Sequence, residues 1–474
     1  MKAWAVAAAA AFIASPAAAA AFDPAPWLAD LKQAREAFHE KYANWYWLET
    51  EHELKIDPLF DDVAERLRNA RSEAAAKVAF DRLVRKVGDG HVEIDWPDPP
   101  DAMGIAPAGP KTADLCTEIG YDSRQNGKGT ARALAGYEPL PGDNPFDAGT
   151  VTVAGTKIGV LRIGIFQPQG YPELCRSAVR ELSIPPTKPC DDRCQDDIVT
   201  WAYQRLTEAL EDRIRALKAA GATALLVDIT NNGGGSEWAE AAARSFSPRQ
   251  LVSERRGFVR GIHWAKQWQD LANDLREHAK KAGRADKPRL LDWAVEADAA
   301  RHQAQMPCPA GSKSCAALGT AGYSTGLVGS ARAGAFAGKD WGVLVFNPAQ
   351  FPYHDGVWSG PLIVLVDQET WSAAEEFAAV LQDNKAAVII GARTGGAGCG
   401  HTNGGTPTTL RNSGAILKLP DCVRFRADGS NEVRGIIPDE TVAIRADDGA
   451  QFRANLIAEK LPSAIARARA LLAQ

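Results

Sequence analysis

The stretch PLIVLVDQETWSAAEEFAAVLQDN, from Pro361 to Asn384, constrains the fold of this chain more than any other. Its first part, Pro361–Val366, is apolar without alternation, which is typical of a parallel strand covered on both faces. After a short turn, apolar residues recur at steps of three and four and predict an amphipathic helix. Ser372 stands at the corner between strand and helix. The stretch therefore predicts an α/β fold with a serine at a strand-to-helix turn.

A serine at such a corner has two interpretations. Most often it is only an N-cap, whose hydroxyl accepts a backbone hydrogen bond. The start of a helix also favours negative charge, because free N–H groups and the positive end of the helix dipole lie there. That environment suits a developing oxyanion beside the hydroxyl of Ser372. This stretch alone leaves both interpretations open.

A second segment, ALLVDITNNGGGSEWAEAAARSF, has a similar construction. The apolar strand Ala224–Ile229 leads into Gly233, Gly234 and Gly235, and a helical pattern follows. In a parallel sheet both corners lie at the carboxyl edge of the strands, where ligands of α/β folds bind. The N–H groups of the two corners are therefore able to converge on one oxygen, which favours a catalytic role for Ser372.

The two segments resemble the serine peptidase family that includes the C-terminal processing peptidases and the tricorn core peptidase. VDITNNGGG is similar to the family's glycine turn, and DQETWSAAEEFAAVLQDN followed by VIIGARTGG is similar to its nucleophile segment. The resemblance implies a crotonase-like α/β fold with a mostly parallel sheet. It also implies a nucleophile at Ser372, one oxyanion-hole donor at Gly233 or Gly234, and a second donor at Ala373.

The general base separates the branches of this family. Where the processing peptidases have a catalytic lysine, this chain has Ala397. The resemblance therefore points to the tricorn-like branch, in which a histidine takes the serine proton and a carboxylate orients the histidine. His91, in VGDGHVEIDW after the N-terminal helices, matches the histidine, and Glu432, in NEVRGIIPDE, matches the carboxylate. His401, in GCGHTNGG, is the main competitor of His91.

These residues also have structural interpretations. A lone histidine in a turn is usually structural, and Glu432 fits the surface of a turn after Asp428–Gly429. The tricorn-like branch has a serine directly before its histidine, and here that place is Gly90. We therefore expect Glu432 to orient His91 with less help, and a serine at Gly90 to be tolerated.

The chain has 474 residues, which is enough for more than one domain. The inserted subdomain, residues 256–357, is expected either to cover the active cleft or to be a peripheral decoration. The predicted segments are a signal peptide at 1–20, an N-terminal helical subdomain at 21–88, the first part of the catalytic α/β domain at 89–255, an inserted subdomain at 256–357, the second part of the catalytic domain at 358–445, and a C-terminal helical segment at 446–474.

Residues 1–20 are typical of a secretory signal peptide. They contain Lys2 and then an alanine-rich apolar run without an acidic residue, and small residues around Ala18–Ala21 allow cleavage. The run is too short for a convincing membrane-spanning helix. We expect a soluble protein that is periplasmic or secreted.

Composition and cysteine usage agree with export. The formal charge is −5, and nothing predicts the basic face that nucleic acids require. No C-x-x-C motif occurs and the histidines are scattered, so no metal site or cofactor is expected. Eight cysteines fit an oxidising compartment. Their spacing favours Cys190–Cys194, Cys308–Cys315 and Cys399–Cys422, which leaves Cys116–Cys175.

Together these features predict a secreted serine peptidase that hydrolyses peptides or unfolded proteins through Ser372, His91 and Glu432. One alternative is a non-catalytic binding protein for small apolar ligands, because the resemblance extends to retinoid-binding modules with this fold. Another is the hydrolysis of a non-peptide ester. The sequence predicts no oligomeric state.

Overall fold

The structure is a computed structural model that describes residues 22–97, 114–185, 190–307, 318–445 and 447–473. The predicted signal peptide and the predicted Cys308–Cys315 disulfide lie outside these ranges. Within them, none of the helices combines the length and the apolar character that crossing a membrane requires.

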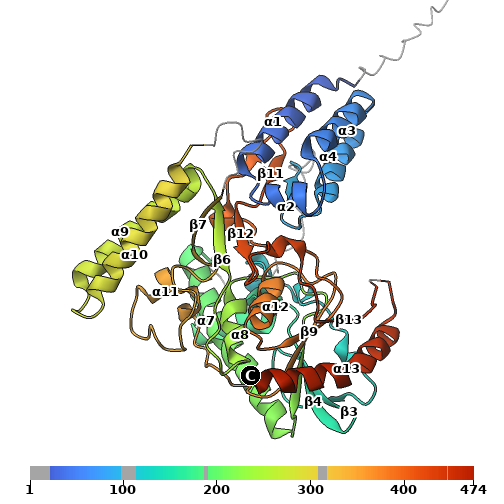
Figure 1. Cartoon of the computed structure of the whole chain (residues 1–474), viewed down its shortest axis with the longest axis vertical. Coiled ribbons are helices and arrows are strands. Elements are labelled where there is room, and N and C mark those ends of the chain that lie inside the picture. Colours follow the sequence, from blue (N-terminus) through green and yellow to red (C-terminus); the bar gives the residue numbers. More distant parts are fainter. Residues whose placement is uncertain (1–21, 98–113, 186–189, 308–317, 446, 474) are drawn as a thin grey trace, which may run out of the picture.

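A seven-stranded sheet forms the centre of the molecule (Figure 1), in the order β13-β9-β8-β5-β4-β3-β2. Neighbouring strands from β13 to β4 are parallel, and β4, β3 and β2 are antiparallel. This arrangement confirms the predicted α/β fold with a mostly parallel sheet. The strands are β2 (Glu138–Pro139), β3 (Ala148–Val153), β4 (Thr156–Arg162), β5 (Ala224–Asp228), β8 (Leu362–Val366), β9 (Val388–Gly391) and β13 (Glu440–Thr441).

Helices cover both faces of this sheet. Side chains alternate between the faces of a strand, so Val227 and Val364 pack in the core formed with α7, α8 and α12. Leu226 and Ile363 point the other way and pack with α13. All residues of β5 and β8 are buried, which explains their unbroken apolar sequence. The helices are α7 (Asp192–Ala219), α8 (Trp238–Ser245), α12 (Ala373–Asp383) and α13 (Ala450–Leu472).

The N-terminal helices form a separate layer above the sheet in Figure 1. They share a hydrophobic core with a small antiparallel sheet, β1-β11-β10, whose last two strands come from the C-terminal part of the chain. The N-terminal helices are thus joined to the rest of the molecule by strands from the C-terminal part of the chain. The elements are α1 (Ala25–Lys41), α2 (Trp45–Thr50), α3 (Ile56–Arg68), α4 (Glu73–Val87), β1 (Glu93–Asp95), β10 (Thr408–Thr409) and β11 (Ile416–Lys418).

A third antiparallel sheet, β12-β6-β7, carries a projecting helical hairpin (Figure 1). Trp264, Trp268 and Leu275 of the first helix are buried in the hairpin core, so this helix is exposed on one side only. The elements are β6 (Arg255–Val259), α9 (Ile262–Lys281), α10 (Lys287–Gln305), β7 (Leu318–Tyr323) and β12 (Cys422–Phe425); the remaining helices are α5 (Leu115–Glu118), α6 (Pro172–Glu181) and α11 (Gly342–Val345).

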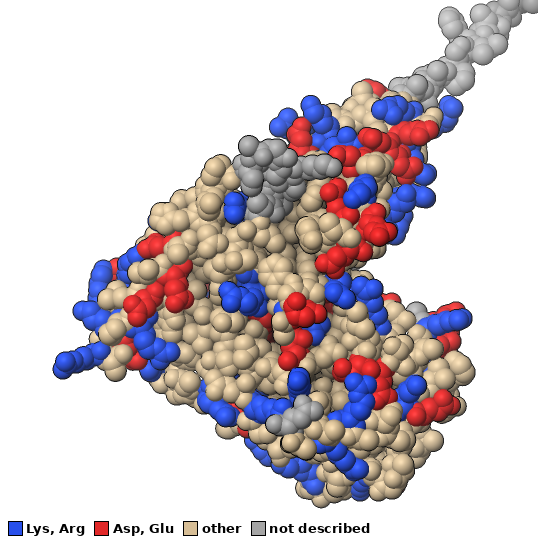
Figure 2. Space-filling view, in the orientation of Figure 1, with Lys and Arg blue, Asp and Glu red and all other residues tan. Residues whose placement is uncertain are grey.

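Three disulfides join parts of the described chain. Cys190–Cys194 and Cys399–Cys422 are formed as their spacing predicts, and Cys116–Cys175 is formed as the remaining pair. The last of these ties the loop after β9 to β12. On the face shown in Figure 2, acidic and basic side chains are interspersed, which fits the small formal charge.

Candidate active site

Ser372 lies at the corner between β8 and α12. Its backbone has φ 53° and ψ −120°, and a residue with a side chain seldom adopts a positive φ. The N–H of Ser372 donates to Oε2 of Glu375 at 2.9 Å, and the N–H of Trp371 donates to the carbonyl oxygen of Asn232 at 2.9 Å. Such strain costs on the order of 1–3 kcal/mol and clusters at functional sites. The surrounding contacts therefore hold Ser372 in a conformation it would not adopt by itself.

The glycine turn after β5 lies directly against this corner. A Cβ atom at Gly234, whose φ is 104°, would lie 2.8 Å from Cβ of Ser372 and 3.1 Å from the nitrogen of Ala373. Only glycine fits there. The N–H of Gly234 donates to Oδ1 of Asn232 at 2.9 Å, so it is already engaged. Of the two predicted glycine donors, Gly233 is therefore the better placed to donate to a ligand.

Ala373 occupies the first position of α12, where an N–H has no partner within the helix. Among the hydrogen bonds of the described ranges, none is donated by this N–H or by that of Gly233. Both groups are thus available to an oxyanion, and their role stays a prediction.

His91 follows the end of α4, and its ring is fixed from one side. Nδ1 lies 2.6 Å from the carbonyl oxygen of Ala397. A carbonyl oxygen only accepts, so Nδ1 carries the proton and Nε2 keeps a lone pair. The backbone is fixed by buried Asp89, whose Oδ1 accepts from the N–H of His91 at 3.0 Å and whose Oδ2 accepts from Tyr42 and Asn44. His91 is therefore held in the tautomer that a general base requires.

The loops that carry His91 and Ser372 meet at the ring of Trp371. A Cβ atom at Gly90 would lie 2.6 Å from carbons of this ring, and one at Gly395 would lie 2.4 Å from it. Because Gly90 precedes His91 and Trp371 precedes Ser372, the contact brings the two predicted catalytic residues into one neighbourhood. It also contradicts the expectation that a serine at Gly90 is tolerated, since any side chain would overlap the indole.

Glu375 connects the serine corner to the loop after β9. Its carboxylate is completely buried and accepts four hydrogen bonds. The donors are the N–H of Ser372 at 2.9 Å, the N–H of Ala397 at 2.8 Å, the N–H of Gly396 at 2.8 Å and the hydroxyl of Thr394 at 2.5 Å. Burial raises the pKa of Glu375 to about 7, while these donors favour its charged form.

Glu432 lies in the short turn Glu432–Arg434 and is completely buried. Both of its oxygens accept from Arg424, at 3.0 Å for Oε1. Arg424 also donates to the carbonyl oxygen of Ser372 at 3.3 Å. None of the hydrogen bonds in the described ranges joins Glu432 to His91, in contrast to the expected contact. The structure therefore links Glu432 to the serine corner through Arg424, and its role in orienting His91 stays a prediction.

Two further buried carboxylates face Arg424. Oε2 of Glu376 lies 3.3 Å from Nη1 of the guanidinium, and Oε2 of Glu254 lies 3.6 Å from Nε. Burial raises the pKa of Glu376 to about 8. Burial and the nearby charge of Glu432 raise the pKa of Glu254 well above its ordinary value. One guanidinium thus lies among three buried carboxyl groups behind Ser372.

His401, the competitor of His91, lies beside it. The two ring centroids are 5.7 Å apart with the rings nearly perpendicular. Burial, and then the charge of His91, lower the pKa of His401. Its Nε2 is buried without a hydrogen-bond partner among the residues described. His401 therefore packs on the ring of His91 and does not replace it at the junction with Trp371.

Sequence reasoning missed Glu375 and Asp89. Glu375 follows Ser372 by three positions, which is the spacing of a capping box, S-x-x-E. That pattern indicates the contact between Glu375 and the N–H of Ser372, but not the bonds to the distant loop. Asp89 precedes His91 by two positions, a spacing typical of a side chain that accepts from a nearby backbone N–H.

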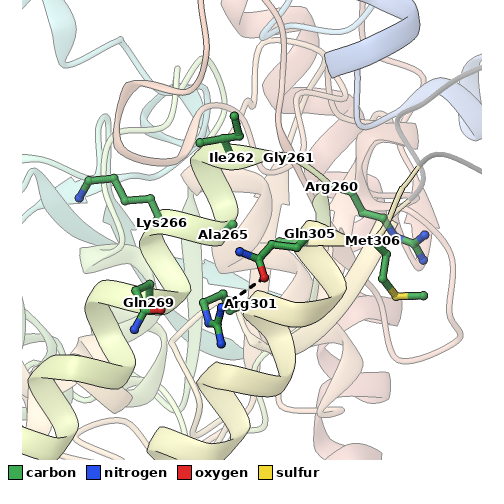
Figure 3. Close-up of a pocket in the computed structure, with 10 residues that line it drawn as sticks. Arg260, Gly261, Ile262, Ala265, Lys266, Gln269, Arg301, Gln305 and Met306 are labelled. Atoms are coloured by element: carbon green, nitrogen blue, oxygen red, sulfur yellow. Dashed lines mark hydrogen bonds between the residues drawn. The ribbon is translucent and has the colours of Figure 1, made fainter.

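A cavity of about 520 Å³ lies away from this site, between the first turn of α9 and the last turn of α10 (Figure 3). Arg260, Lys266 and Arg301 line it, and Arg301 donates to Gln305 at 3.2 Å. None of the residues that surround Ser372 contributes to it. The cavity therefore belongs to the helical hairpin.

The family follows from the comparison with known sequences. The model of peptidase family S41 matches residues 197–442, which is more than half of the chain and includes the glycine turn, the serine corner and Glu432. The chain belongs to peptidase family S41 and is a peptidase. No curated protein sequence matches it significantly.

Solved structures of CPAF share the fold. The structure of mature CPAF complexed with lactacystin is 15% identical, with a TM-score of 0.58, over 94% of this chain and 99% of that chain. Mature CPAF alone is 15% identical, with a TM-score of 0.57, over 94% and 98%. A putative peptidase from Parabacteroides merdae is 13% identical, with a TM-score of 0.47, over 93% and 96%. At these identities the likeness to CPAF shows the fold alone.

Proposed function

We propose that this peptidase is of the serine type, with Ser372 as nucleophile and His91 as general base. One observation carries the proposal: the carbonyl oxygen of Ala397, 2.6 Å from Nδ1, leaves Nε2 of His91 with its lone pair, on a loop that contacts Trp371, the residue before Ser372. The strained serine corner supports it, because the hydroxyl stands at the N-terminus of α12 beside unengaged N–H groups.

In the proposed reaction, Nε2 of His91 takes the hydroxyl proton while Oγ of Ser372 attacks the carbonyl carbon of a peptide bond. The N–H groups of Gly233 and Ala373 donate to the resulting oxyanion. The imidazolium of His91 then protonates the leaving amine, and an acyl-serine remains. A water molecule then attacks the acyl carbon and gives a proton to Nε2 of His91. The bond between this carbon and Oγ breaks, His91 returns the proton to Oγ of Ser372, and the second product leaves as a carboxylic acid.

A lysine base fits this chain less well. Ala397 stands where the resemblance to the processing peptidases places the lysine. Lys385 comes after the end of α12, and an eleven-residue helix is about 16 Å long. We therefore assign the base to His91. The predicted carboxylate, Glu432, is connected to Ser372 through Arg424, which donates to both Glu432 and the carbonyl oxygen of Ser372.

The proposed substrates are peptides or unfolded proteins, and the proposed location is the periplasm or the exterior of the cell. The signal-like residues 1–20 and the three disulfides support export, since disulfides persist in oxidising compartments. Fractionation of cells that produce the full chain tests the location: we expect a processed form outside the cytoplasm, and a full-length cytoplasmic form would contradict it.

Turnover of an unfolded protein tests the activity. The wild type should cleave a reduced and alkylated protein, and Ser372→Ala and His91→Ala should lose cleavage while keeping the circular dichroism of the wild type. His401→Ala serves as the matched histidine control and should retain much more activity than His91→Ala. Full cleavage by Ser372→Ala would overturn the proposal.

A further inference from the structure

The group that orients a catalytic histidine is here a peptide carbonyl. Nδ1 of His91 donates to Ala397, and a carbonyl holds the ring only as firmly as its own loop is held. That loop contains Gly395, Gly396, Gly398 and Gly400, and the last three have positive φ. Glycine allows more backbone conformations than any other residue, so this sequence alone does not fix the path of the loop. Some other group must fix the position of the Ala397 carbonyl.

Glu375 is the group that does so. Three of its four hydrogen-bond donors belong to the loop, namely Thr394, Gly396 and Ala397, and the fourth is the N–H of Ser372. One carboxylate therefore sets the nucleophile corner and the acceptor of His91 at the same time. The contacts run from the N–H of Ser372 to Glu375 at 2.9 Å and from the N–H of Ala397 to Glu375 at 2.8 Å. The carbonyl oxygen of Ala397, in the next peptide group, lies 2.6 Å from Nδ1 of His91.

The other carboxylates near the site are engaged elsewhere. Glu432 and Glu376 pair with Arg424, and the carboxylate of Asp89 contacts the backbone N–H of His91, not its ring. Among the described residues, Glu375 is therefore the carboxylate that holds the backbone of Ala397, whose carbonyl oxygen accepts from Nδ1 of His91.

We propose that Glu375 is a positioning residue that takes the place of a carboxylate on Nδ1 of His91 and acts through the backbone of Ala397. This inference rests on the proposed function and deepens it. The ionised carboxylate accepts all four donors and stabilises the imidazolium that forms when His91 takes the serine proton. A protonated Glu375 would have to turn one oxygen from acceptor to donor, and the three backbone N–H groups that now donate to it cannot accept that proton.

Other charged groups act on the same titration. His91 faces Asp89 on its own loop and His401 on the loop after β9, and Glu375 faces Glu432, which is paired with Arg424. Burial raises the pKa of Glu375 to about 7, so its charge is half developed at neutral pH, increases above it and declines below it.

The test is Glu375→Gln, an isosteric change that replaces two acceptor oxygens by one oxygen and one NH₂ group. We expect kcat to fall by roughly a hundredfold or more with little change in KM, because an acceptor of several N–H groups is lost while the substrate pocket remains. The pKa of the His91 imidazole should also fall, because removal of a nearby negative charge disfavours the imidazolium. This pKa is measured by NMR in a Ser372→Ala background with and without Glu375→Gln, so the readout does not need turnover.

The matched control is Glu240→Gln. Glu240 is an equally buried glutamate, paired with Arg244 on α8. The Glu240→Gln variant should be less stable than the wild type but should leave the pKa of His91 unchanged. Thr394→Val, which removes one donor to Oε1 of Glu375, provides a second variant if Glu375→Gln does not fold, and should shift kcat in the same direction by a smaller factor.

The outcomes separate this inference from the proposed function. If Ser372→Ala keeps full activity, the serine mechanism fails. If Ser372→Ala is inactive but Glu375→Gln, or Thr394→Val in its place, leaves kcat and the pKa of His91 as in the wild type, the mechanism stands and the role of Glu375 is overturned.

Discussion

Gly90 lies against the indole ring of Trp371, so closely that a Cβ atom on the glycine would be 2.6 Å from the ring carbons. This contact joins the loop of His91 to the corner of Ser372, because His91 directly follows Gly90 and Ser372 directly follows Trp371. The position of the proposed base therefore depends on a residue that has no side chain.

Replacement of Gly90 by alanine or serine should lower activity. The added atoms must push the indole or the His91 loop aside, and overpacking of this kind costs about 1–3 kcal/mol. We expect kcat to fall at least tenfold, because small displacements of a base from its nucleophile have large effects on rate. Gly283→Ala is the matched control, since a Cβ atom there meets nothing within 4 Å. Equal activity of the Gly90 and Gly283 variants would show that Gly90 does not set the distance between His91 and Ser372.

The two glycines of the turn should respond differently to alanine. At Gly234 the Cβ atom would lie 2.8 Å from Cβ of Ser372 and the φ of 104° is strained for any side chain, so Gly234→Ala should reduce kcat by roughly a hundredfold or more. At Gly233 the Cβ atom would enter open space and the N–H would remain, so Gly233→Ala should lose far less. Steady-state kinetics of both variants on one peptide substrate decide the point, and the reverse order would contradict the assignment.

Glu432→Gln should act mainly on stability. The buried guanidinium of Arg424 would lose the negative charge of Glu432. Breaking such a buried ion pair costs about 3–5 kcal/mol. We expect a lower midpoint in urea unfolding and, because Glu432 does not contact His91, an unchanged acidic limb in the pH profile of kcat/KM. A shifted acidic limb with unchanged stability would instead support the role in orienting His91 that the resemblance implies.

Stability should decrease with rising pH through the acidic and neutral range where Glu376 titrates. Burial raises the pKa of Glu376 from 4.5 to about 8, so the folded state holds this proton more tightly than the unfolded state. The stabilisation is complete below pH 4.5 and is lost as the pH rises to about 8. Glu376→Gln removes this titration, so its free energy of unfolding should decline less steeply than that of the wild type between pH 5 and pH 8. Equal slopes in urea denaturation series would contradict the raised pKa.

The fold was predictable because its signals are local. The apolar runs of β5 and β8 and the helical spacing of α12 are visible in single segments, and short cysteine spacings predicted two of the three described disulfides. The position of Ser372 at the strand-to-helix corner follows from the same segment. The packing of α1–α4 against β11 was not predictable, since it joins residues more than three hundred positions apart.

The supporting residues of the site were hidden for a physical reason. The pairing of Glu432 with Arg424, the four donors of Glu375 and the contact of Gly90 with Trp371 all depend on how distant loops are placed. A carboxylate in the sequence carries no sign of which cation or N–H it will meet. Family resemblance supplied the expected contact of Glu432 with His91, and the structure places a guanidinium on that carboxylate instead.

The central claim is that Ser372 is a nucleophile activated by His91. Its most direct test is the reaction with a fluorophosphonate, followed by mass spectrometry of the intact protein and of its peptides. We predict one adduct per chain at neutral pH, on the peptide that contains Ser372, with labelling abolished in Ser372→Ala and strongly slowed in His91→Ala. An unlabelled Ser372 peptide, under conditions in which a known serine peptidase is fully labelled, would contradict the claim.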